Sequence, residues 1–155
     1  MKINEQVLSR KQMAHLRELG IDTSDASLCW DWSDEDGGWV LGFMNPLLQE
    51  ISNPPYGEGP FPAYTIADLI EKLPKRIPHK YKRFIDVDLF LFPYIGLEDD
   101  GTITETMQVA YQAYGVDGKG YWHDFPHERE FDLPVKDRLY YALCYIAENY
   151  KELIK

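Results

Sequence analysis

Cysteine and long apolar runs are both scarce in this sequence, and each shortage makes certain classes of protein improbable. Only Cys29 and Cys144 are present among 155 residues, too few for a disulfide framework. In a reducing compartment we expect both to be small, buried, apolar residues. The longest apolar run, residues 140–147, is too short to span a bilayer, and the first residues contain no apolar core of signal-peptide length. These observations predict a cytoplasmic protein that does not associate with membranes.

Motifs of the common enzyme and cofactor classes are also missing. The sequence contains no Walker loop, no GxGxxG, GxSxG, CxxC or HExxH motif and no recognisable Ser/His/Asp arrangement. Enzyme classes that depend on these motifs are therefore unsupported, and we expect no cofactor. The sequence leans toward a protein that is not an enzyme, without deciding the question.

Basic residues are few compared with acidic ones. The chain has 26 acidic and 16 basic residues, which gives a net charge of −10. An acidic surface disfavours nucleic acid and anionic membranes as partners and favours a basic partner or simple solubility. The one concentrated basic segment, residues 72–83, does not reverse this expectation, because binding to nucleic acid depends on neutralising phosphates.

Length and composition predict a single folded domain over residues 1–155. The chain is 45% hydrophobic and 27% charged, which is enough apolar material to offset the entropy of ordering. Its most apolar helical pattern is residues 134–150, where one broad stripe follows the period of 3.6 residues. We expect this helix to lie across a sheet, with each of Leu139, Leu143 and Ile146 stabilising the fold by about 1.5–3 kcal/mol.

Two shorter helices have clear boundary signals. Ser9 and Gln12 make a capping box, so a helix is predicted over residues 10–19, with Gly20 supplying the left-handed residue that follows it. Thr65 and Asp68 begin a second helix, which Pro74 ends.

Alternating segments predict the strands. Residues 28–43 alternate on both sides of a DEDGG turn, which indicates a hairpin, and residues 84–92 and 102–114 predict a second antiparallel pair. Residues 121–125 predict a fifth, edge strand. The order α-ββ-α-ββ(β)-α predicts an α+β fold: one antiparallel sheet of four or five strands with helices packed on one face.

The segment of residues 45–63 contains five prolines and two glycines, a composition that predicts irregular structure. We favour a packed connection between the hairpin and the next helix. The alternative is an aromatic and polyproline surface for a protein partner, with Tyr56, Phe61 and Tyr64 as the candidate binding residues.

The densest group of possible metal ligands or acid/base residues is His123, Asp124, His127 and Glu128. The two histidines have a spacing that binds zinc on a helix, but Pro126 disfavours a helix here and no third ligand stands at a known spacing. We favour a polar loop. The alternative is a metal-assisted hydrolase that uses His123, Asp124 and His127.

Three segments carry a resemblance: VLSRKQMAHLRELGIDTSDAS, FPAYTIADLIEKLPKRI and LYYALCYIAENY. They cover about a third of the chain and resemble a group of small proteins of gut bacteria and their prophages or phages. That group has no assigned activity, so the resemblance implies an accessory role in a mobile element or phage and no particular site residues. We therefore expect a non-catalytic acidic binding protein that acts through a protein partner. The identity of the partner and the oligomeric state are not predicted.

Overall fold

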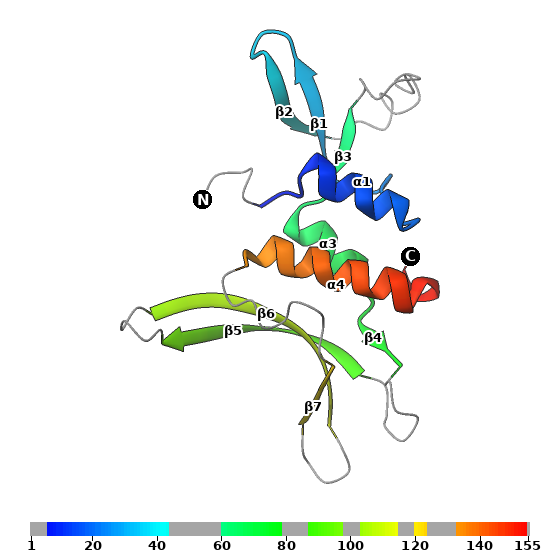
Figure 1. Cartoon of the computed structure of the whole chain (residues 1–155), viewed down its shortest axis with the longest axis vertical. Coiled ribbons are helices and arrows are strands. Elements are labelled where there is room, and N and C mark those ends of the chain that lie inside the picture. The colour runs from blue at the N-terminus through cyan, green and yellow to red at the C-terminus, as the bar shows by residue number, and fades with distance from the viewer. Residues whose placement is uncertain are drawn as a thin grey trace. The chain divides into compact units, whose positions relative to one another are not determined.

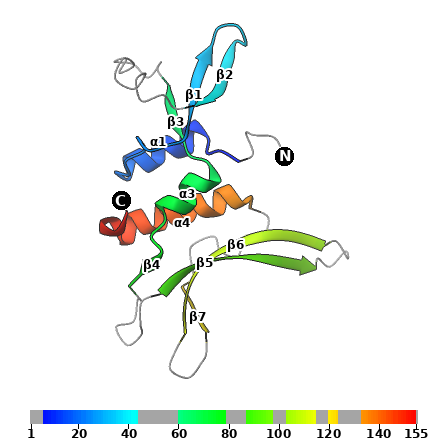
Figure 2. The same ribbon diagram turned by 180° about the vertical axis from the view of Figure 1, so that it is seen from behind.

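The structure is a computed structural model that describes residues 6–43, 60–78, 87–97, 103–114, 120–123 and 133–154. The chain divides into two compact units, unit 1 (Met1–Ile70) and unit 2 (Glu71–Lys155). Each unit contains helical residues and an antiparallel sheet, which confirms the α+β class (Figures 1 and 2).

Helix α1 (Arg10–Glu18) begins where the sequence predicts and ends one residue earlier, with Leu19 as its C-cap. The Gln12 backbone N–H donates to Ser9 Oγ at 3.3 Å, and the Ser9 N–H donates to Gln12 Oε1 at 3.0 Å, which completes the capping box. Gly20 then has a φ of +80°, a left-handed conformation that costs glycine little because it has no Cβ.

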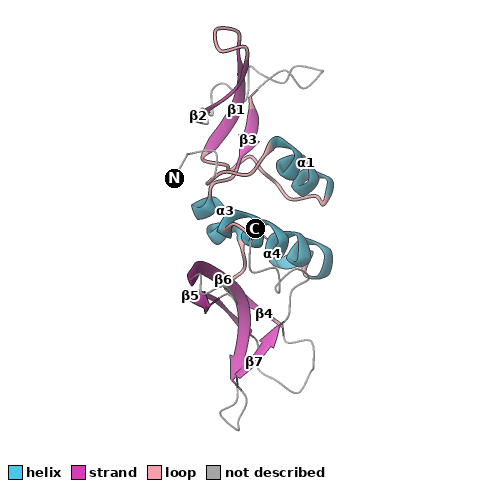
Figure 3. Ribbon diagram, turned by 60° about the vertical axis from the view of Figure 1, so that its left-hand side comes forward, coloured by secondary structure: helices cyan, strands magenta, loops and turns pink. Residues whose placement is uncertain are grey.

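The sheet of unit 1 has three antiparallel strands in the order β2-β1-β3. Strands β1 (Leu28–Ser33) and β2 (Gly38–Phe43) form the predicted hairpin, and β3 (Phe61–Ala63) pairs with the other side of β1. Helix α1 contacts β3, so this helix packs at one edge of the sheet (Figure 3).

Strand β3 corrects one sequence prediction, because residues 45–63 were expected to be irregular throughout. Residues 44–59 lie outside the described residues, but the last three residues of the segment form a strand. Pro62 is tolerated there because β3 is an edge strand, where a missing backbone N–H need not break a ladder.

Helix α3 (Ile66–Lys72) starts with a capping box and stops before Pro74, as predicted. The Asp68 N–H donates to Thr65 Oγ1 at 3.2 Å, and the Thr65 N–H donates to Asp68 Oδ2 at 2.8 Å. The same carboxylate accepts from the Ser27 backbone N–H at 3.3 Å and from the Ser27 hydroxyl at 2.5 Å. Asp68 therefore fixes both the helix start and the loop that leads into β1.

Unit 2 contains a four-stranded antiparallel sheet in the order β4-β5-β6-β7. Its centre is the long pair β5 (Val87–Leu97) and β6 (Ile103–Tyr114), which the sequence predicts in kind although β5 continues five residues past the expected end. β7 (Gly120–His123) is the expected edge strand, whereas β4 (Arg76–Ile77) was not predicted.

Helix α4 (Val135–Asn149) packs on β6 and is followed by the 3₁₀ turn Lys151–Leu153 (Figures 1 and 3). Leu139, Leu143 and Ile146 are fully buried, as the apolar stripe predicts. Arg138 is buried on the same helix, where its Nη1 donates to the buried Gln108 Oε1 at 3.0 Å and its Nε donates to a backbone carbonyl at 3.0 Å. No helix of the described residues combines the length and apolar character needed to cross a membrane.

The prediction of one sheet with four or five strands and helices on one face is wrong. The strands belong to two sheets: β1 pairs with β2 and β3, whereas β5 and β6 pair with each other and with β4 and β7. The helices follow the same division, since α1 contacts β3 and α4 contacts β6.

Candidate binding surface

The side chains of one sheet face in unit 1 form the most distinctive surface of the described chain. Strand register puts Trp32 directly opposite Trp39, and Trp30 opposite both Leu41 and Phe61. Directly paired residues point to the same side of a sheet, so these five side chains share one face. We call it the aromatic face.

Trp32 is the exposed member of the aromatic face. The residue is 48% exposed, although large apolar residues are usually buried. The ring meets Trp39 edge to face, with centroids 5.7 Å apart at 75°. Its indole N–H donates to Asp34 Oδ1 at 2.9 Å, which holds the ring in place at the hairpin turn.

Two arginines of α1 lie over the aromatic face. The Arg10 guanidinium carbon is 3.5 Å from the centroid of a Trp39 ring and 5.7 Å from that of Phe61, and the Arg17 guanidinium carbon is 5.6 Å from Phe61. Within the described residues Arg10 Nε is buried without a hydrogen-bond partner, so the negative face of the indole ring is its compensating contact. This stack ties α1 to β2 and β3.

The turn between β1 and β2 places negative charge at the tip of the hairpin. Asp34, Glu35 and Asp36 are all exposed. The Ser33 hydroxyl donates to Asp36 Oδ2 at 2.7 Å and accepts from the Asp36 N–H at 3.1 Å. Gly37 has a φ of +61°, which the turn requires and which side chains rarely adopt. The exposed indole of Trp32 thus contacts one carboxylate, Asp34, of a turn that carries three.

The three residues predicted to bind a partner lie in different environments or outside the described residues. Phe61 is half-buried in β3 and belongs to the aromatic face. Tyr56 lies outside the described residues. Tyr64 is only 1% exposed, and its hydroxyl donates to Asp25 Oδ1 at 2.6 Å and to the Asp22 carbonyl at 2.8 Å. Tyr64 therefore lies in the core of unit 1 and not on a surface that a partner can contact.

Burial also determines how Tyr64 titrates. Loss of hydration raises the pKa of the phenol, and the hydrogen bond to Asp25 and its negative charge raise it further. The hydroxyl stays protonated at neutral pH and acts as a donor, a structural role.

The predicted metal ligands fall mostly outside the described residues. His123 is the last residue of β7, where its backbone pairs with Tyr111 of β6. Asp124, His127 and Glu128 are not among the described residues. Within the described part of the chain no three His, Cys, Asp or Glu side chains form a group suited to a metal ion. The metal-assisted hydrolase stays a prediction.

The two cysteines, both described, are buried and not joined in a disulfide, as the sequence predicts. Burial raises the pKa of the Cys144 thiol to about 11 and also raises the pKa of Cys29, to which the nearby Asp31 adds. Since the thiolate is the nucleophilic form, neither cysteine is poised for nucleophilic catalysis at neutral pH.

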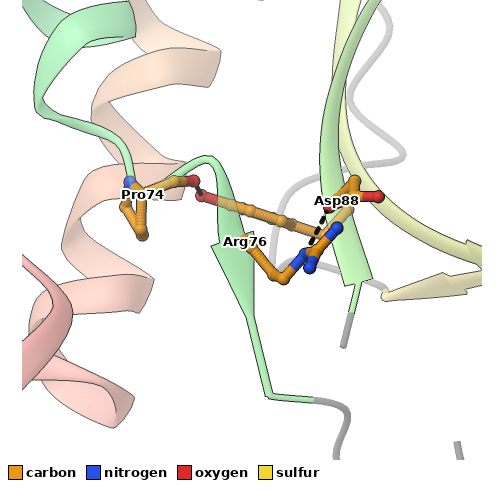
Figure 4. Close-up of polar contacts among 4 residues, drawn as sticks. Pro74, Arg76 and Asp88 are labelled. Atoms are coloured by element: carbon orange, nitrogen blue, oxygen red, sulfur yellow. Dashed lines mark hydrogen bonds and ion pairs between the residues drawn. The ribbon is translucent and has the colours of Figure 1, made fainter. Parts of the chain in front are cut away.

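Part of the basic segment, residues 72–83, has structural roles in unit 2. Arg76 Nε and Asp88 Oδ1 form an ion pair at 2.7 Å between β4 and β5, which Figure 4 shows. Lys72 is buried. The hydroxyl of Tyr111, a buried residue of β6, donates to the Pro74 carbonyl at 2.6 Å. Arg76 is thus paired with a carboxylate, and residues 79–83 lie outside the described residues.

Sequence reasoning found the alternating tryptophans but not the arginines above them. The signal for Trp32 and Trp39 is local, because both belong to a hairpin with a recognisable turn. Arg10 is separated from Trp39 by 29 positions, and its spacing in α1 does not reveal which ring it covers. The exposure, composition and geometry of the aromatic face assign it as the candidate binding surface. No protein-family model, curated protein or solved structure matches the chain.

Proposed function

We propose that this chain is a non-catalytic binding protein that recognises a protein partner through the aromatic face and the acidic turn of unit 1. The observation that carries the proposal is Trp32, a residue that is 48% exposed on a folded scaffold. Trp and Arg dominate the small sets of residues that supply most of the energy at protein interfaces. Here Trp32, Trp39 and Arg10 are in one contiguous group.

Neighbouring residues hold the rings of this group in place, which favours binding without rearrangement. Trp32 is held by Trp39 and Asp34, and Trp39 is covered by Arg10. Trp30 anchors the same strand, because its indole N–H donates to the Leu8 carbonyl at 3.0 Å. A ring that is already fixed loses little conformational entropy when a partner covers it.

The charge around Trp32 favours a basic partner. The ring contacts Asp34 of a hairpin turn with three exposed carboxylates, and the whole chain has a net charge of −10. Opposite charges on a partner increase the association rate and exclude acidic competitors. The resemblance to small proteins of gut bacteria and their prophages or phages adds a context: we propose an accessory protein of a mobile element or phage that acts in the cytoplasm.

Selection from a library of random peptides displayed on phage, with the full chain as bait, tests this function without knowledge of the host. We expect enriched peptides that bind the wild-type chain and lose at least about tenfold in affinity toward Trp32→Ala, as hot-spot residues do. Glu18→Ala, at an exposed position of α1, is the matched control and should bind like the wild type. Circular dichroism of both variants verifies that they fold. Absence of enriched peptides, or equal binding by Trp32→Ala, refutes the proposal.

A further inference from the structure

Among the described residues, no strand pairs with the outer edge of β2 in the unit 1 sheet. β1 is the middle strand, and α1 packs beside β3 on the other side. Within the described residues, the backbone of β2 makes hydrogen bonds only with residues of β1. Because alternate N–H and C=O groups of a strand point to opposite edges, half of those groups in β2 point away from β1.

The residues of β2 themselves supply no charge, proline or bulge, the sequence features that often protect an edge strand. Its sequence, GWVLGF, contains no charged residue and no proline. Its register with β1 runs without a bulge from Gly38 to Phe43, and each of its residues is half-buried or exposed, with Phe43 87% exposed. Edge strands without such protection readily accept a further strand.

The two faces of β2 carry side chains of different chemical character. Trp39, Leu41 and Phe43 point to the aromatic face, because side chains alternate along a strand. Val40 points to the opposite face, where it pairs with the exposed Asp31. The acidic turn, residues 34–36, adjoins the first residue of β2. A strand added at this edge therefore has apolar neighbours on the aromatic face. On the other face the next strand carries Asp31, and the acidic turn lies at the end of the hairpin.

We infer that β2 pairs with an extended segment of a partner protein in which apolar residues alternate with lysine or arginine, so that the partner adds a fourth strand to the sheet. The inference rests on the proposed binding function and specifies the chemistry of its partner. The apolar side chains lie beside those of Trp39, Leu41 and Phe43 on the aromatic face. The basic side chains point to the face of Asp31, and those nearest the end of the hairpin approach the acidic turn.

A second copy of this chain is a poorer occupant of the edge. Each copy has a net charge of −10, and β2 contains no basic residue to approach Asp31 of the other copy. Pairing two β2 strands would also bring two acidic hairpins together, and like charges at close range oppose association. The charge of the edge thus selects a basic strand.

The probe for this inference is a capped heptapeptide in which valine and lysine alternate. Two control peptides contain the same amino acids. The first is N-methylated at two adjacent central residues, which blocks both edges of the strand. The second places all lysines before all valines. We expect the alternating peptide to bind the full chain, as measured by calorimetry. The N-methylated peptide should bind at least about tenfold more weakly, because it cannot make the central backbone hydrogen bonds.

Charge substitutions at Val40 test the same contact from the protein side. Val40→Lys should weaken binding of the alternating peptide by about tenfold, whereas Val40→Glu, a matched change of size and polarity, should bind at least as well as the wild type. Both variants are checked for folding by circular dichroism. If either variant fails to fold, the comparison of the two peptide backbones still decides the question.

The outcomes separate this inference from the proposed function. Equal binding of the alternating and N-methylated peptides overturns edge pairing, and so does failure of the alternating peptide to bind. In both cases displayed peptides that depend on Trp32 still support the binding function. Sedimentation of the chain alone tests whether a second copy occupies the edge. We expect no dimer that depends on β2. A dimer that Val40→Lys disrupts would assign the edge to a second copy and overturn the inference.

Discussion

Cys144 lies on the buried side of α4, and its thiol illustrates how burial changes a single group. Loss of hydration raises the pKa to about 11, although a hydrogen bond with Tyr140 lowers it in part. Tyr111 and Tyr140 have pKa values raised above their ordinary range for the same main reason. These groups are neutral in the folded chain at neutral pH, and folding disfavours their ionisation.

The raised pKa of Cys144 predicts that the folded state weakens in alkali. Below the ordinary thiol pKa of 9.0, the folded and unfolded chains both keep the proton and the stabilisation is fully present. Between pH 9 and about 11 the unfolded chain loses the proton first, so the free energy of unfolding falls. Urea denaturation of the wild type and Cys144→Ala across this range measures the effect. The wild type should lose more stability than the variant, and parallel profiles would contradict the assignment.

Leu143 is fully buried on α4 and is a second test at the residue scale. Leu143→Ala should lower the free energy of unfolding by about 2–5 kcal/mol, because it removes apolar contacts and leaves a cavity. The exposed Glu148 of the same helix supplies the control, and Glu148→Ala should change stability by less than about 0.5 kcal/mol. Urea denaturation followed by circular dichroism compares the variants. Equal stability of Leu143→Ala and the wild type would mean that α4 does not pack as described.

At the scale of elements, short helices depend on their ends. α3 has seven residues, too few to persist as an isolated helix in water. Its first turn is stabilised by Asp68, which accepts hydrogen bonds from Thr65 and from Ser27. One carboxylate thereby joins the start of α3 to the loop before β1.

Asp68→Ala should lower the free energy of unfolding by about 1–2 kcal/mol, since both the capping box and the contact with Ser27 are lost. Asp68→Asn keeps an acceptor oxygen and should retain part of the stability. Glu71→Ala, at an exposed position of the same helix, is the control. Thermal denaturation compares the three variants, and a melting temperature of Asp68→Ala equal to that of Glu71→Ala would refute this role of Asp68.

At the scale of the whole molecule, the predictions that succeeded depend on contacts near in sequence. The capping box of Ser9 and Gln12, the glycine that ends α1 and the β1–β2 hairpin each involve residues within one turn or one loop of each other. The apolar stripe of α4 is equally local, because a helix repeats its faces every few residues.

The features that sequence patterns missed join distant residues. β3 pairs Phe61 with Trp30 across a segment whose prolines predict no strand, and β1 therefore has β2 and β3 as its neighbours. Arg10 covers Trp39, and Arg138 bonds Gln108 on another element. Spacing along the chain carries no information about such contacts, which depend on the fold. Of the two candidate binding residues that the structure describes, Phe61 joins the surface that Trp32 and Trp39 form and Tyr64 does not.

The central claim is that the β1–β2 hairpin of unit 1 carries the binding surface. Amide-resolved NMR of the ¹⁵N-labelled full chain, titrated with the alternating valine and lysine heptapeptide, tests it most directly. The account predicts shifts concentrated in residues 32–43, with the indole N–H of Trp32 among them and with backbone amides of β2 protected from exchange in the complex. Shifts confined to unit 2, or spread evenly over the acidic surface, would contradict the account.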